Sequence, residues 1–161
     1  MSTHLITLKQ VPCNHSDFLQ LCSELDTYLN RAIGGEDKRE KYKKYNHLNT
    51  MDYVIIAYDG QQAQAAGCAA LRKYSETEIE VKRVFVKESY RGQGIGGQML
   101  EHLIKHAQEI DYKYILLETG AFLKASVHLY MRYGFMQIEN YGDYKDMPES
   151  LCMKRDINAD V

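Results

Sequence analysis

Alternating and helical patterns of apolar residues follow one another along the chain. Residues 4–11 alternate as a strand, and residues 15–35 place apolar side chains at helical spacing before a closing glycine pair. Residues 53–60, 63–74 and 78–86 are strand candidates joined by short turns, which predicts an antiparallel meander.

The second half of the chain alternates helix and strand. The pattern predicts a helix over residues 94–109, a strand over 112–118, a helix over 123–134 and a closing strand over 151–156. No linker or repeat interrupts this order, so we expect one domain over residues 1–161. Strands first and crossovers afterwards predict an α/β fold with a mixed, mainly antiparallel sheet and helices on both faces.

Composition and charge narrow the function classes. The chain has 161 residues, 45% hydrophobic and 26% charged, with a net charge of -2, which gives no general electrostatic reason to bind nucleic acid or an anionic membrane. The first residues lack a signal-peptide pattern and no apolar run is long enough to span a bilayer, so we expect a cytoplasmic protein. The basic run at residues 36–47 is interpreted as a solvated helix face rather than an RNA contact.

Metal and disulfide chemistry are not expected. His102 and His106 have i,i+4 spacing, but they lack the rest of a zinc motif and a third ligand. The cysteines form no CxxC pair and show no regular spacing, so we expect buried, reduced thiols. They are Cys13, Cys22, Cys68 and Cys152.

The strand at 78–86 changes its apolar face part-way along. Its apolar residues stand at odd positions up to Val81 and at even positions from Val84, so the period of two slips near Lys82 and Arg83. A β-bulge would restore one apolar face and leave backbone amides for an extended ligand that carries amides of its own. A strand that is partly buried on both faces explains the pattern equally well.

The stretch "RGQGIGGQML", residues 91–100, places four glycines within six positions before an apolar helical stripe. Glycines at a helix start let consecutive N–H groups converge on an anion, so we expect a phosphate-bearing ligand. The spacing formally matches GxGxxG, with Glu118 at a strand end about twenty residues on. However, "KESYR" separates the glycines from the strand, and the chain after Glu118 is too short for the second half of a dinucleotide fold.

Two motifs occur here in a fixed order. "VKRVFVKESYRGQGIG" is a strand, a short loop and then Gln/Arg-x-x-Gly-x-Gly/Ala, and "SVHLYMRYGF" is close to Ala-x-x-Leu-Tyr-x-x-x-Gly-Phe. Together they cover about Glu80 to Phe135 and resemble the GNAT superfamily of acetyl-CoA-dependent N-acyltransferases. The resemblance implies a GNAT-like fold, acetyl-CoA as cosubstrate without a metal, and transfer of the acetyl group to a primary amine.

The resemblance also implies where acetyl-CoA binds. The pyrophosphate would lie on the amides of the glycine loop, the pantetheine amides would pair with the bulged strand, and Arg91 would hold the phosphates or the loop. Many members carry Asn three residues before the Ala of the second motif, where this chain has Leu123, with Ser126 in place of the Ala. The expected cofactor-binding residues are Val84, Phe85, Val86, Arg91, Gly92, Gln93, Gly94, Ile95, Gly96, Gly97 and Ser126.

The reaction calls for a base and an acid. An alkylammonium has a pKa of about 10 and must lose a proton before it attacks the thioester, while the departing thiolate gains from receiving one. The resemblance suggests Glu80 as the base, acting through water, although it could simply face solvent or pair with Lys82. It suggests Tyr130 as the acid, although a packed tyrosine fits too. Tyr141 and Tyr144 are candidates for the acceptor pocket or for packing.

Two functions from different classes therefore stay open. One is an N-acetyltransferase whose partners are acetyl-CoA and an amine on a small molecule or a protein. The other is a non-catalytic acyl-CoA-binding sensor or regulatory module. The sequence leaves the acceptor unidentified and the oligomeric state open, with a homodimer as one candidate.

Overall fold

A computed structural model describes residues 5–34, 48–61 and 63–159. The chain divides into two compact units, which are described separately. Unit 1 comprises Met1–Ala70 and Arg83–Met99, and unit 2 comprises Leu71–Lys82 and Leu100–Val161. The basic run at 36–47 lies outside the described residues.

Among the described residues, seven strands form one mixed sheet. They are β1 (Ile6–Val11), β2 (Tyr53–Asp59), β3 (Gln64–Lys73), β4 (Glu78–Val86), β5 (Tyr114–Gly120), β6 (Met136–Ile138) and β7 (Ser150–Asp156). Their order is β1-β2-β3-β4-β5-β7-β6. β4 and β5 pair in parallel, whereas β1 with β2, β5 with β7, and β6 with β7 are antiparallel. The predicted mixed, mainly antiparallel sheet is confirmed.

The part of the chain that the structure describes also contains three α-helices. They are α1 (Ser16–Ile33), α2 (Ile95–Glu109) and α3 (Lys124–Arg132), with short 3-10 helices η2 (Leu48–Thr50), η3 (Glu88–Tyr90) and η4 (Gly142–Tyr144). The helix α1 begins where the His15 imidazole accepts the N–H of Asp17, and it ends at Gly34, whose φ is 100°. Within the described residues, no helix combines the length and apolar character needed to cross a bilayer.

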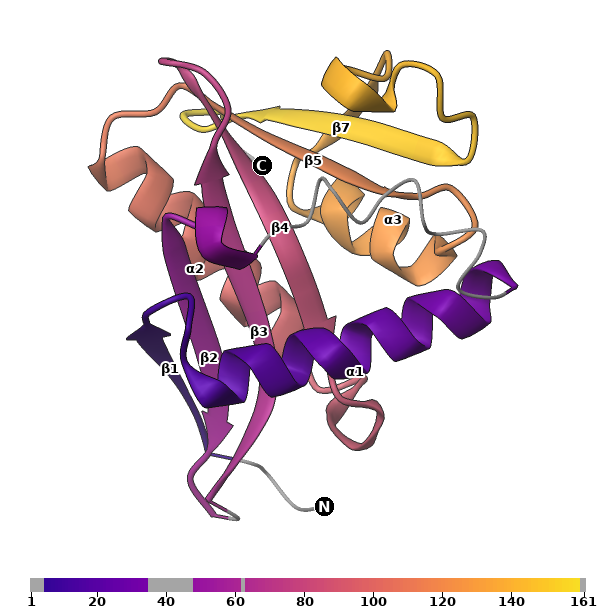
Figure 1. Ribbon diagram of the computed structural model, residues 1–161. Helices are drawn as coiled ribbons and strands as arrows, with labels where there is room; N and C mark the ends of the chain where they lie inside the picture. Colours follow the sequence, from indigo (N-terminus) through magenta and orange to yellow (C-terminus); the bar gives the residue numbers. More distant parts are fainter. Residues whose placement is uncertain (1–4, 35–47, 62, 160–161) are drawn as a thin grey trace. The chain divides into compact units, whose positions relative to one another are not determined.

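In unit 1, helices cover both faces of the sheet. Figure 1 shows α1 crossing β2 and β3, and its buried Phe18 belongs to one core cluster with Ile56 of β2 and Cys68 of β3. A Cβ added at the neighbouring Gly67 would project from the opposite face of β3 and would lie 3.3 Å from the Met99 side chain of α2. The expected helices on both sides of the sheet are therefore found around β3.

In unit 2, one face of the sheet carries carboxylates. Glu78 and Glu80 of β4 lie opposite Tyr114 and Leu116 of β5. Because alternate residues of a strand share a face, Glu118 of β5 projects to that same face. The other face is apolar and includes the buried side chains of Ile79, Ile115, Leu117 and Met153.

The cysteines are all free thiols. Cys22, Cys68 and Cys152 are buried as expected, whereas Cys13 is half-buried. Burial raises the pKa of the Cys152 thiol to about 11.

Candidate active site

The glycine loop of unit 1 adopts a backbone that glycine favours. Gly92 and Gly94 have φ angles of 76° and 81°, in the left-handed region that is unfavourable for most residues. An added Cβ would meet no atom within 4 Å at either position. These two glycines are therefore required by backbone conformation rather than by crowding, and they leave open space above the loop.

The loop presents the first amides of α2. The Gln98 N–H donates to the Gly94 carbonyl at 3.0 Å, so the helical ladder begins there. The N–H groups of Ile95, Gly96 and Gly97 precede that first bond, and they lie at the positive end of the helix dipole. Ile95 is buried and fixes the turn, while residues 91–94 are exposed. This geometry suits a bound phosphate.

Arg91 fastens the loop to strand β4. Its Nε donates to the Val86 carbonyl at 2.9 Å. Its guanidinium lies 4.7 Å from the ring centroid of Tyr28 in α1 and 5.8 Å from that of Phe85. Of the two roles considered for Arg91, the contacts in this structure support anchoring of the loop.

Strand β4 departs from extended geometry where its apolar pattern slips. Arg83 has a φ of 59°, which is unusual for a residue other than glycine within a strand. Its side chain is 4% exposed and donates to the Cys22 carbonyl at 2.9 Å and to the Asp26 carboxylate at 3.0 Å. All residues from Ile79 to Arg83 are buried, so the irregularity and burial of both faces occur together.

Glu80 lies in a buried polar cluster of unit 2. Its side chain is 2% exposed. Arg72 Nη2 donates to Oε1 at 3.0 Å, and the Tyr141 hydroxyl donates to Oε2 at 2.5 Å. Lys82, on the same strand, donates to the Tyr144 hydroxyl at 3.0 Å. Glu80 therefore does not face solvent, and two donors hold its carboxylate.

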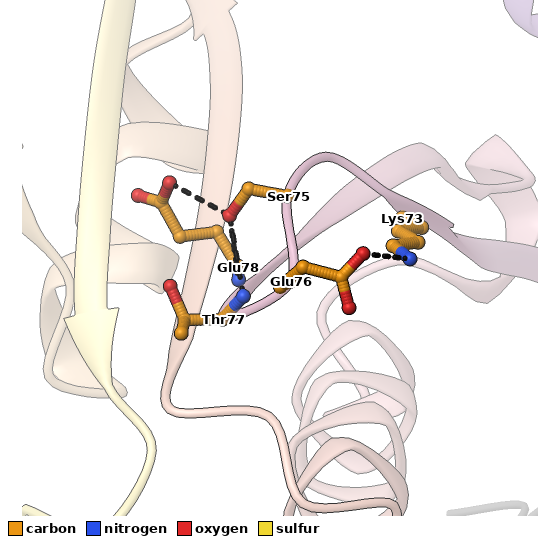
Figure 2. Close-up of polar contacts among 5 residues, drawn as sticks. All are labelled: Lys73, Ser75, Glu76, Thr77 and Glu78. Carbon is orange, nitrogen blue, oxygen red and sulfur yellow. Dashed lines mark hydrogen bonds and ion pairs between the residues drawn. The ribbon is translucent and has the colours of Figure 1, made fainter.

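The hairpin between β3 and β4 explains the position of Arg72. The N–H of Tyr74 donates to the Glu78 carbonyl at 3.0 Å. Figure 2 shows the turn, in which the Ser75 hydroxyl accepts the N–H groups of Thr77 at 3.3 Å and Glu78 at 3.1 Å. Continuing this antiparallel pairing by two residues on each strand brings Arg72 opposite Glu80.

Three tyrosines pack together beside Glu80. The Tyr141 ring meets those of Tyr74 and Tyr144 edge to face, with centroids 5.1 Å and 5.7 Å away. Burial, followed by the charge of Glu80, raises the pKa of Tyr141 far above its usual value. Burial likewise raises the pKa of Tyr144, so both hydroxyls stay protonated at neutral pH. Tyr141 is half-buried, whereas Tyr144 is buried.

Tyr130 is a buried residue of α3. It is 7% exposed, and its ring lies edge to face with Phe135 at 5.9 Å. Burial, with the nearby charge of Glu118, raises the pKa of Tyr130 well above its usual value. The hydroxyl therefore stays protonated at neutral pH. Ser126, one turn earlier on α3, is half-buried.

The expected site residues divide between the two units. Unit 1 brings together the strand and loop residues expected to bind the cofactor, from Val84 to Gly97. Unit 2 contains Glu80, Ser126 and Tyr130. Sequence reasoning did not assign Arg72 to the site, although the hairpin register could have placed it opposite Glu80.

Comparison with known proteins identifies the family of this chain. Residues 19–135 match the model of the "Acetyltransferase (GNAT) family". The chain belongs to the GNAT family of acetyltransferases. An IAA acetyltransferase of Azospirillum brasilense is 31% identical over 147 residues, covering 86% of this chain and 90% of that protein. The N-acetyltransferase YsnE of Bacillus subtilis, itself uncharacterized, is 31% identical over 103 residues, covering 63% of this chain and 67% of its own.

Solved GNAT structures share the fold. A GNAT acetyltransferase from Elizabethkingia anophelis with acetyl-CoA bound has a TM-score of 0.70 at 21% identity, covering 94% of this chain and 97% of that one. The PaiA N-acetyltransferase of Thermoplasma acidophilum, in complex with coenzyme A, has a TM-score of 0.73 at 17% identity, covering 94% and 99%. At these identities the likeness establishes the GNAT-like fold alone.

Proposed function

We propose that this GNAT protein transfers an acetyl group from acetyl-CoA to a primary amine by direct attack of the amine on the thioester. The observation that carries the proposal is the row of α2 amides at Ile95, Gly96 and Gly97, presented by the left-handed turns at Gly92 and Gly94. A pyrophosphate is a doubly charged anion whose oxygens match these donors. The relatives with acetyl-CoA or coenzyme A bound support the same ligand.

The rest of the cofactor would follow strand β4. Pantetheine carries two amide groups, and the irregular backbone at Arg83 followed by Val84–Val86 offers polar groups for them. The Arg91 side chain, bonded to the Val86 carbonyl, keeps the loop next to this strand. This chain has Leu123 and Ser126 where the family pattern has Asn and Ala, so the start of α3 offers no Asn side chain to the pantetheine.

Glu80 and Tyr130 would carry out the proton transfers. Glu80 receives a proton from the acceptor ammonium, which leaves a neutral amine to attack the acetyl carbon. As the new C–N bond forms, the C–S bond breaks and the thiolate takes the hydroxyl proton of Tyr130. The nitrogen then returns its surplus proton to Tyr130, and N-acetyl product and free CoA thiol remain.

The binding site is tested with two substitutions at one residue. Gly94→Asp and Gly94→Asn both enter open space and both tolerate a left-handed backbone, but only Asp brings a negative charge toward the phosphates. In calorimetry with CoA, we expect Asp to lose at least tenfold more affinity than Asn. Equal affinities of both variants and the parent would place the phosphate elsewhere.

A second function is supported by the bonding of Glu80. A carboxylate held by Arg72 and Tyr141 is also what a purely structural residue would show, as in a non-catalytic acyl-CoA-binding module. Release of free thiol from acetyl-CoA in the presence of a panel of amines separates the two. Tight binding of acetyl-CoA without thiol release for any amine would favour the sensor.

A further inference from the structure

Glu80 is closed off from any acceptor that arrives from solvent. Its side chain is 2% exposed, so neither solvent nor a dissolved amine reaches the lone pairs that its two hydrogen bonds leave open. Among the described residues, its hydrogen-bond partners are Arg72 and Tyr141. A proton from a bound amine must therefore reach Glu80 through one of these groups or after one has moved.

The two neighbours differ in their chemistry. A guanidinium has donors but no acceptor and stays protonated, so Arg72 cannot receive a proton. A phenolic hydroxyl both donates and accepts. The Tyr141 hydroxyl donates a hydrogen bond to Glu80 Oε2 at 2.5 Å and keeps oxygen lone pairs that can accept from a second partner. The Tyr141 residue is half-buried rather than buried.

We propose that Tyr141 relays the proton from the acceptor amine to Glu80, an inference that rests on the function proposed above. The ammonium gives one N–H proton to Tyr141 Oη while the Tyr141 hydroxyl proton passes to Glu80 Oε2. Tyr141 is neutral before and after the step, Glu80 becomes a carboxylic acid, and the acceptor becomes a free amine. After turnover the proton leaves Glu80 by the reverse route to solvent.

The surroundings of Tyr141 suit this role. The edge-to-face rings of Tyr74 and Tyr144 fix its orientation, and the adjacent Gly142, with a φ of 55°, begins η4. A tyrosine whose pKa is raised by burial and by Glu80 does not ionise at working pH. It therefore transfers a proton only in concert with Glu80, as a relay requires.

The test compares Tyr141→Phe, Glu80→Gln and the double variant in steady-state thiol release with a reactive amine. We expect each single variant to lose kcat/KM by a factor on the order of 10² near neutral pH, with CoA affinity unchanged. Because both residues act on one proton, the double variant should be no worse than the poorer single variant, within about threefold. Losses that multiply would show that Glu80 and Tyr141 act independently and would overturn the relay.

A matched control removes the same kind of hydrogen bond elsewhere. The Tyr58 hydroxyl donates to the Asp17 carboxylate at 2.6 Å, so Tyr58→Phe loses an equivalent bond between residues with no assigned role in the reaction. This variant should keep the parental pH profile of kcat/KM. A profile altered as much by Tyr58→Phe as by Tyr141→Phe would reduce the effect at Tyr141 to stability and overturn the proposal.

A second measurement uses the unmodified enzyme and does not depend on the folding of a variant. With chemistry rate-limiting, kcat/KM is followed in mixtures of H2O and D2O. Two protons moving together should give a curved dependence on the deuterium fraction, and a straight line would overturn the relay. If the parent enzyme releases no thiol with any amine, the proposed function itself fails. An active parent with a fully active Tyr141→Phe variant refutes only the relay.

Discussion

Replacing Glu80 by Gln separates its structural role from its chemical one. Glutamine keeps the shape of the side chain but offers one acceptor oxygen, whereas Arg72 and Tyr141 each donate to a different carboxylate oxygen. With the amide oxygen toward Arg72, the NH2 group faces the Tyr141 hydroxyl, which can turn and accept from it. The variant therefore keeps two hydrogen bonds but loses the charge assistance of both, worth roughly 1.5–3 kcal/mol in total. Because the Arg72 side chain is 25% exposed, water takes up part of this loss and the lower end of the range is expected.

The stability change has a measurable size. For a chain of this length, each kcal/mol shifts Tm by roughly 2–4 °C, so Glu80→Gln should melt about 3–8 °C below the parent. The kinetic change should depend on pH. An amine with a pKa of about 10 is mostly protonated near neutrality, so loss of its base should lower kcat/KM by a factor on the order of 10² there. The deficit should shrink as the pH approaches the amine pKa.

The assay measures thiol release from pH 6.5 to pH 10 at a temperature where both proteins are folded. Glu78→Gln is the matched control, because Glu78 is a carboxylate on the same strand and face and pairs with Lys154 at 3.1 Å. It should keep the parental pH profile. A small and pH-independent loss in Glu80→Gln, alongside the expected drop in Tm, would make Glu80 a structural residue and refute the assignment.

Three further results follow from the contacts. Tyr130→Phe removes the hydroxyl but keeps the packed ring. If the hydroxyl is the acid, kcat should fall by a factor on the order of 10² to 10⁴ in steady-state kinetics, with CoA affinity unchanged. A variant that retains half the parental kcat would reject that role. Gly67→Ala should lower the free energy of unfolding in urea by on the order of 1–3 kcal/mol, because the added Cβ would lie 2.5 Å from the Phe85 carbonyl oxygen. Unchanged stability would contradict this close approach. At pH 8 a thiol reagent should modify the half-buried Cys13 of the native protein but not Cys152, which is buried and has a pKa of about 11. Mass spectrometry of digests would identify the labelled residues. Rapid labelling of Cys152 would contradict its burial.

Local patterns in the sequence predicted most of the fold, because each long element buries one face. The helix expected at 15–35 is found at Ser16–Ile33, and the strand expected at 78–86 has those bounds. Strand β6 was missed for a physical reason. It has three residues, Met136 is 73% exposed and Gln137 is exposed too, so no alternation marks it. Its pairing with β7 defines it, and pairing between distant segments leaves no trace in local periodicity.

The same division between local and distant contacts applies to the candidate site. The glycine loop could be predicted because its conformation and its amides belong to one short segment, from Gly92 to Gly97. The surroundings of Glu80 depend on two kinds of contact. Arg72 lies across a four-residue turn, whereas Tyr141 is 61 residues away and reaches Glu80 only through the folded chain.

That distant contact changes what the site can do. The resemblance to the family suggested a carboxylate that takes a proton through water, and such a carboxylate needs an oxygen that water can reach. In the structure, the Glu80 side chain is 2% exposed, and both of its oxygens accept hydrogen bonds. Tight bonding makes Glu80 better positioned but less accessible. Both properties are compatible with catalysis if one of the hydrogen-bonded groups itself passes on a proton, and of Arg72 and Tyr141 only the tyrosine has that chemistry.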